Sequence, residues 1–151
     1  MSNEYNEVAY RDARARINPT PCMFEKAILS TCVACSLAEK HLLAERETSN
    51  CSDSAARQTC LHLLEALLSH SAFALKITAA DATIPHNKAL KAQCGGLLGL
   101  QRALDGVAAV TDVHRLVNLA LQQYGSIEAL PYGAIVQFVA GFSMRQRGPG
   151  K

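Results

Sequence analysis

The stretch from Ser54 to Ile77 constrains the fold most, because it contains neither proline nor glycine and is apolar on nearly every side of a helix. One strip of polar residues recurs at helical spacing: Gln58, His62, Glu65, Ser69 and Lys76. This pattern predicts a long helix with one narrow polar strip, capped at its start by Ser52 or Ser54. A helix of this kind lies near the centre of a helical protein or is covered by a partner.

Turn-forming residues divide the rest of the chain into further predicted helices. The first is expected to run from Pro21 to about Arg46, after a cap at Thr20. Its apolar stripe is Phe24, Ile28, Thr31, Cys35, Ala38 and Leu42. The others are expected over residues 85–104, over residues 111–124 with Thr111 as the cap, and over residues 131–146.

The sequence CGGLLG places three glycines inside the helix predicted over residues 85–104. Each glycine costs about 1 kcal/mol relative to alanine in a helix interior. Such a cost is tolerable where a second backbone approaches closely or where the helix kinks. We therefore expect one of these two features at this point of the chain.

The composition favours helices over sheets. Hydrophobic residues make up 49% of the 151 residues, whereas aromatic residues make up only 5% and tryptophan is absent. A core of Leu, Ala, Val and Ile suits closely packed helices. We predict an all-α fold without strands, an up-and-down helical bundle of four main helices plus a short extra helix. The expected organisation is a flexible or weakly helical segment 1–18, a single bundle domain 19–146 and a disordered tail 147–151.

The charge and hydropathy exclude several classes of protein. A net charge of +2 is too small to indicate a nucleic-acid binder. The acidic N-terminal sequence is unlike a secretory signal, and no apolar stretch approaches the ~20 residues that span a membrane. A cytoplasmic location is therefore expected, where the six cysteines would be free thiols.

Cys32 and Cys35 form a C-x-x-C sequence. On a helix, residues three apart share one side, and Cys60 would lie about one turn from the level of Cys35 in an antiparallel helix pair. The main interpretation is that these residues pack in the core as small hydrophobic side chains, with no cofactor. The alternatives are a zinc or copper site on Cys32, Cys35 and Cys60, or regulatory thiol chemistry.

The polar strip of the long helix contains two further candidate pairs. His62 and Glu65, with Glu39 as a helper, are either a solvated pair or part of a di-metal site. The sequence RQTCLH, with Arg57 five residues before His62, resembles the Arg-x4-His element of HEPN ribonucleases. This resemblance implies a dimer in which two copies of both residues meet and cleave RNA without metal.

Two further histidines, His70 and His114, are not expected to be ligands. His70 is expected to be a hydrogen-bonded core histidine, and His114 to lie on the surface in a first helical turn.

The apolar faces left over indicate an interaction protein more than an enzyme. The last predicted helix is apolar through Ile135, Phe138 and Phe142, and Gly133 and Gly141 allow a close approach of another helix. We expect a non-enzymatic interaction or adaptor module that self-associates as a dimer through this helix, or that holds another protein partner. In the alternative, the last helix only covers its own bundle.

Overall fold

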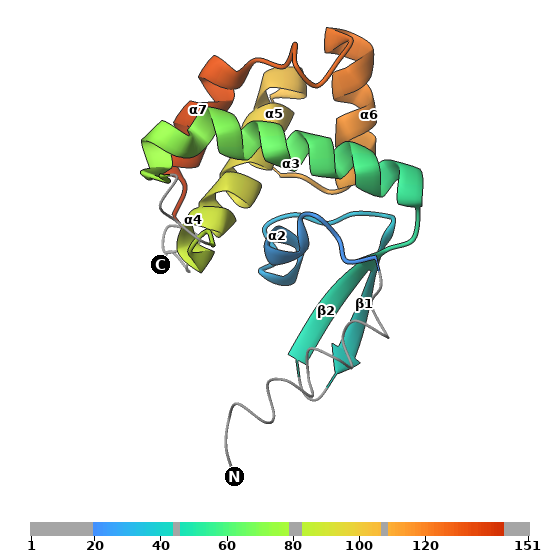
Figure 1. The fold of residues 1–151 in the computed structure, drawn as a ribbon. Helices are drawn as coiled ribbons and strands as arrows, with labels where there is room; N and C mark the ends of the chain where they lie inside the picture. The colour runs from blue at the N-terminus through green and yellow to red at the C-terminus, as the bar shows by residue number, and fades with distance from the viewer. Residues whose placement is uncertain (1–19, 44–45, 79–82, 107–108, 144–151) are drawn as a thin grey trace.

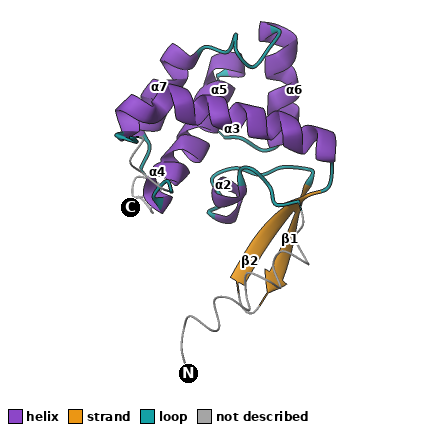
Figure 2. Ribbon diagram, viewed as in Figure 1, coloured by secondary structure: helices purple, strands orange, loops and turns teal. Residues whose placement is uncertain are grey.

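The computed structural model describes residues 20–43, 46–78, 83–106 and 109–143, which form a mostly helical structure with one small sheet (Figures 1 and 2). The helices are α2 (Glu25–Leu29), α3 (Ser54–Leu75), α4 (His86–Leu90), the π-helix η1 (Lys91–Gly95), α5 (Gly96–Asp105), α6 (Val113–Tyr124) and α7 (Tyr132–Gly141). The strands are β1 (Ala38–Leu43) and β2 (Arg46–Cys51). The expected helical class is confirmed, because the structure is mostly helical. The prediction that the chain forms no strands is wrong.

The long helix α3 is confirmed almost to its predicted bounds. Asp53 caps it, rather than Ser52 or Ser54, because the Asp53 carboxylate accepts a hydrogen bond from the Ala56 N–H at 3.0 Å. The helix ends where Lys76 adopts a left-handed conformation with φ of 58°. In Figure 1, α3 runs across the directions of α5 and α6. Its buried side chains are Leu63, Leu67, Ser71 and Leu75.

The long first helix predicted from Pro21 to Arg46 is wrong. Helix α2 ends at Leu29, and Thr31 adopts a left-handed conformation with φ of 65°, which a continuing helix does not permit. The chain then pairs with a distant segment, since the Ala34 N–H donates to the carbonyl of Val110 at 3.2 Å. Long-range pairing therefore overrides the helix propensity of this stretch.

A β-hairpin replaces the second half of that predicted helix. The strands β1 and β2 pair antiparallel, from Ala38 opposite Cys51 to Leu43 opposite Arg46. Figure 1 shows the hairpin extending away from the helices. A further bridge between Pro21 and Asn50 joins β2 to the segment before α2. Leu42, expected to pack on neighbouring helices, is 74% exposed on this hairpin.

Helices α4, η1 and α5 together occupy the range predicted for a single helix. The expected close approach is confirmed, because a Cβ atom at Gly95 would lie 2.7 Å from the Cα atom of Val139 in α7. A Cβ atom at Gly99 would lie 3.0 Å from the Cβ atom of Phe138. The glycines thus allow α7 to lie directly against α5 and η1, and η1 adds the wider turn of a π-helix.

The remaining boundaries differ in detail from the predicted ones. Asp112, rather than Thr111, caps α6 by accepting a hydrogen bond from the His114 N–H at 3.1 Å. Helix α7 ends at Gly141, before the predicted end at residue 146. The predicted segments 1–18 and 147–151 lie outside the described residues, and the domain boundaries stay predictions.

Candidate functional site

The C-x-x-C sequence is divided between two environments. Cys32 forms a disulfide with Cys94, which links the loop after α2 to η1, with 6.2 Å between the two Cα atoms. The expectation of six free thiols is therefore wrong for this pair. Because the Cys32 sulfur is bonded to Cys94, the set of Cys32, Cys35 and Cys60 does not come together as three free ligands.

The four remaining cysteines line one small cavity, the thiol cavity. Cys22, Cys35, Cys51 and Cys60 are free thiols, and all four contribute to its wall. The volume of this cavity is about 40 Å³. Sites for drug-sized ligands measure roughly 300 to 1,000 Å³, so this space suits at most a few water molecules.

Backbone pairing explains how thiols distant in sequence reach this cavity. The Cys22 N–H donates to the carbonyl of Ser49 at 3.0 Å, which holds the segment before α2 against β2. Arg57 Nε donates to the carbonyl of Pro21 at 2.8 Å and ties the first turns of α3 to the same segment. Cys60 lies about one turn further along α3, on the side that faces the cavity.

Burial keeps three of these thiols, those of Cys22, Cys35 and Cys60, protonated near neutral pH. Burial raises the pKa of Cys22 to about 11 and the pKa of Cys60 to about 12. Burial also raises the pKa of Cys35. Repulsion between neighbouring thiolates adds to each of these shifts. Since the thiolate is the metal ligand and the nucleophile, the arrangement favours packing over reactivity.

The zinc or copper alternative needs at least three ligand side chains close together. Within residues 20–43, 46–78, 83–106 and 109–143, no group of three or more His, Cys, Asp or Glu side chains is placed to hold a metal ion. The zinc or copper alternative therefore has no preformed site in this part of the chain.

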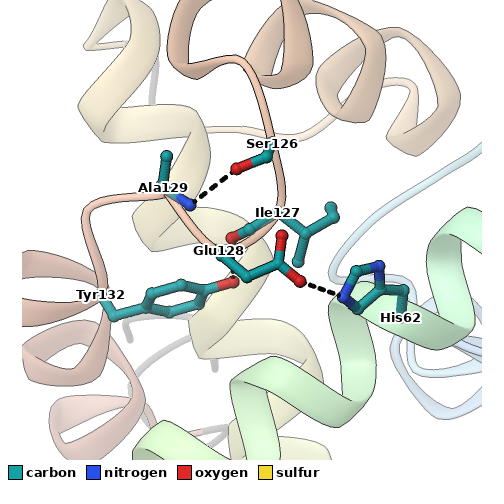
Figure 3. A network of polar contacts seen from close by, with 6 residues as sticks. All are labelled: His62, Ser126, Ile127, Glu128, Ala129 and Tyr132. Carbon is teal, nitrogen blue, oxygen red and sulfur yellow. Dashed lines mark hydrogen bonds and ion pairs between the residues drawn. The ribbon is translucent and has the colours of Figure 1, made fainter.

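Arg57 and His62 turn toward different partners. Arg57 is bound to the carbonyl of Pro21, whereas His62 Nε2 lies 2.8 Å from Glu128 Oε2 in the loop between α6 and α7 (Figure 3). Glu39, the suggested helper of a di-metal site, lies on β1, where it is exposed. The two residues of the HEPN-like element do not meet within one chain, and their meeting across a dimer stays a prediction.

A polar network around Glu128 connects α3 with the start of α7. Figure 3 shows the Tyr132 hydroxyl near the carbonyl of Ile127, to which it donates a hydrogen bond at 2.6 Å. The His70 ring stacks on the Tyr132 ring with 3.9 Å between centroids. His70 is exposed, so the expectation of a core histidine is wrong. The hydrogen bond from the backbone N–H of Glu128 itself, and after it the hydrogen bond from His62, hold the pKa of Glu128 below its usual value.

The partners in this network have no local signal in the sequence, because Glu128 is 66 residues from His62.

His114 is half-buried in the first turn of α6, where its Nε2 lies 3.2 Å from the Asn118 side-chain nitrogen.

Helix α7 has a buried inner face and an open outer face. Ile135 and Val139 are fully buried against the rest of the chain. Beside the outer face is an open groove of about 360 Å³. Its lining residues are Gly95, Leu98, Gln137, Phe138, Gly141, Phe142 and Ser143. Phe138 is 37% exposed, and the Arg102 guanidinium carbon lies 5.7 Å from the centre of its ring.

Comparisons with protein families, with curated proteins and with solved structures find no match to this chain. Among the described residues, none of the helices combines the length and the apolar character that crossing a bilayer requires. The cytoplasmic location stays a prediction.

Proposed function

We propose that this chain is a non-enzymatic interaction module that self-associates as a two-fold dimer through the outer face of α7. The observation that carries the proposal is the open apolar groove beside a helix that contains no charged residue between Tyr132 and Ser143. Interface cores are depleted of charge and enriched in aromatic residues. Phe138 and Phe142 supply such aromatic side chains at this groove.

A second copy of the same chain is the partner that this face fits. Gly133, Gln137 and Gly141 follow one another at steps of four residues on the exposed side of α7. A Cβ atom built on Gly133 or Gly141 meets nothing within 4 Å, so another backbone has room to approach. The Gln137 amide both donates and accepts hydrogen bonds, so two copies facing each other across a two-fold axis are complementary.

The dimer is expected to be weak. A standard interface buries about 1,600 Å² in total, and one crossing of two short helices supplies less than that. Interfaces below about 1,200 Å² belong to transient complexes. We therefore expect a dissociation constant in the micromolar range. A dissociation constant of 1 μM corresponds to a binding free energy of about −8 kcal/mol.

Sedimentation velocity between about 1 and 100 μM tests the proposal, with the range chosen around the micromolar affinity. The protein should shift from a 16.2 kDa monomer toward a dimer as its concentration rises. Gly133→Glu places a charge in the interface without a clash inside the chain, and it should abolish the shift. Gln122→Glu adds the same charge on the exposed part of α6 and should leave the shift unchanged. A monomer at all concentrations contradicts self-association, and an unaltered Gly133→Glu dimer contradicts this face.

A further inference from the structure

The two cysteines of the Cys32–Cys94 disulfide differ in exposure to solvent. Cys94 is 0% exposed within η1, whereas Cys32 is partly exposed in the loop after α2. Thiol–disulfide exchange requires the attacking sulfur to reach one sulfur of the bridge, and the other sulfur leaves. Access therefore selects Cys32 as the attacked residue and Cys94 as the leaving group.

The Ser30 hydroxyl lies beside both sulfurs. Its oxygen is 3.7 Å from Cys32 Sγ and 3.8 Å from Cys94 Sγ, and it also donates to the carbonyl of Ala27 at 3.1 Å. Hydrogen bonds to charged groups are about twice as strong as those between neutral groups. A thiolate formed on Cys94 would therefore be a better acceptor for this hydroxyl than the Ala27 carbonyl is. Turning the Ser30 hydroxyl is enough to direct its hydrogen to Cys94 Sγ.

The local backbone holds these groups together. Thr31 stands between Ser30 and Cys32 and adopts a left-handed conformation with φ of 65°, which turns the chain back on itself. Such conformations are unfavourable for residues other than glycine, and they gather at functional sites. Cys94 lies on a π-helical turn, a second irregular feature that is frequent at functional sites.

We propose that the Cys32–Cys94 bridge is an exchangeable disulfide and that Cys32 Sγ is the site at which a low-molecular-weight thiol forms a mixed disulfide. The thiolate of the small thiol attacks Cys32 Sγ and forms a new S–S bond. The Cys32–Cys94 bond breaks, and its electron pair stays on Cys94 Sγ. Ser30 donates a hydrogen bond to this leaving thiolate, and the proton that the small thiol released on ionisation finally neutralises Cys94.

Completion of the reduction needs a second small thiol, because Cys35 does not resolve the mixed disulfide. Cys35 lines the thiol cavity, whereas Cys32 is directed to Ser30 and Cys94. A second thiolate attacks the sulfur of the bound small thiol, which releases the small disulfide and leaves Cys32 reduced. Two small thiols are thus oxidised for one protein disulfide reduced.

Reduced glutathione under argon is the probe, with acid quenching and peptide mass spectrometry at early times. Free thiols do not form adducts with a reduced thiol, so every early adduct reports on the bridge. The expected result is one glutathione on Cys32 and a free thiol on Cys94 in the folded protein. An early adduct on Cys94, or bridge reduction no faster than global unfolding, overturns the proposal.

The role of the hydroxyl is tested with Ser30→Ala against Ser69→Ala, a matched change on the exposed side of α3. Loss of a hydrogen bond to a charged leaving group should slow the first exchange step about tenfold in Ser30→Ala. Ser69→Ala should react at the rate of the unaltered protein. Equal rates in the two variants contradict the assigned role of Ser30, whereas the glutathione adduct site tests the exchange itself without any substitution.

Discussion

Replacing Gly95 by alanine tests whether the direct contact between η1 and α7 sets the packing of the helices. The added Cβ atom would lie 2.7 Å from Val139 Cα and 2.8 Å from the carbonyl oxygen of Phe138. Both are backbone atoms, so the clash cannot be relieved by turning a side chain. Helix α7 must move away, and the contacts of Val139 with the core loosen.

The expected change in the free energy of unfolding combines two opposing effects. Overpacking in a core costs about 1 to 3 kcal/mol, and a clash with backbone atoms belongs at the upper end of that range. Alanine in place of glycine inside a helix returns about 1 kcal/mol. The net loss is therefore about 2 kcal/mol, which lowers the melting temperature of a chain of this size by about 4 to 8 °C.

Gly133→Ala is the matched control, because it makes the same chemical change in α7 where a Cβ atom meets nothing within 4 Å. It should raise the free energy of unfolding by about 0.5 to 1 kcal/mol. Urea denaturation followed by circular dichroism at low micromolar concentration measures both variants. If Gly95→Ala is as stable as Gly133→Ala, the close packing of η1 against α7 is refuted.

Two further predictions concern the cysteines. Replacing Cys32 and Cys94 together by serine removes a bridge between residues 62 positions apart in sequence. The loop-entropy relation then predicts that the free energy of unfolding falls by about 4 kcal/mol, measured by urea denaturation. An unchanged urea midpoint would contradict a structural contribution of the bridge. The folded-state pKa values of Cys22 and Cys60, about 11 and about 12, lie above the ordinary value of 9.0. Their stabilisation is therefore complete below pH 9 and is lost as the pH rises from 9 toward 12, because the unfolded chain releases these protons first. Urea midpoints between pH 8 and 11 should fall for the unaltered protein and fall less for Cys22→Ala, and parallel curves would contradict the burial of this thiol.

Local sequence was enough to predict those elements whose determinants are local. Helix α3 could be predicted because its uninterrupted helical spacing, a capping position near residue 53 and a stop near residue 76 are all adjacent in the chain. The glycines near Cys94 indicated a close backbone approach, although the sequence did not say that α7 was the approaching element.

The segment after α2 could not be predicted, because its determinants are distant in sequence. Helix-forming residues occupy β1, but the segment directly before β1 is held by distant parts of the chain. Ala34 pairs with Val110, and Cys32 bonds to Cys94. A propensity of a few tenths of a kcal/mol per residue is small beside a covalent bridge and a set of backbone hydrogen bonds. The inferred shared side for Cys32 and Cys35 failed for the same reason, since it assumed helical spacing.

The thiol cavity was only partly predictable. Cys35 and Cys60 were expected to lie near each other in a pair of antiparallel helices, and both line the cavity. They meet there because the β-hairpin and the Pro21 segment hold the start of α3, not because two long helices pack together. Cys22 and Cys51 join them through backbone pairing that has no spacing signal in the sequence.

The position of the Cys32–Cys94 bridge also decides what a protease could release from this protein. The hairpin β1–β2, the helix α3 and the helix α4 all lie between the two bonded cysteines. A single cut anywhere in that covalent loop leaves one molecule of unchanged mass, apart from one added water, whose two pieces separate only after reduction. A cut beyond Cys94, between α5 and α6 for example, frees its C-terminal piece from any covalent link to the rest. The same protease thus leaves the two pieces linked by the disulfide when it cuts between Cys32 and Cys94, and it releases a separate C-terminal fragment when it cuts after Cys94.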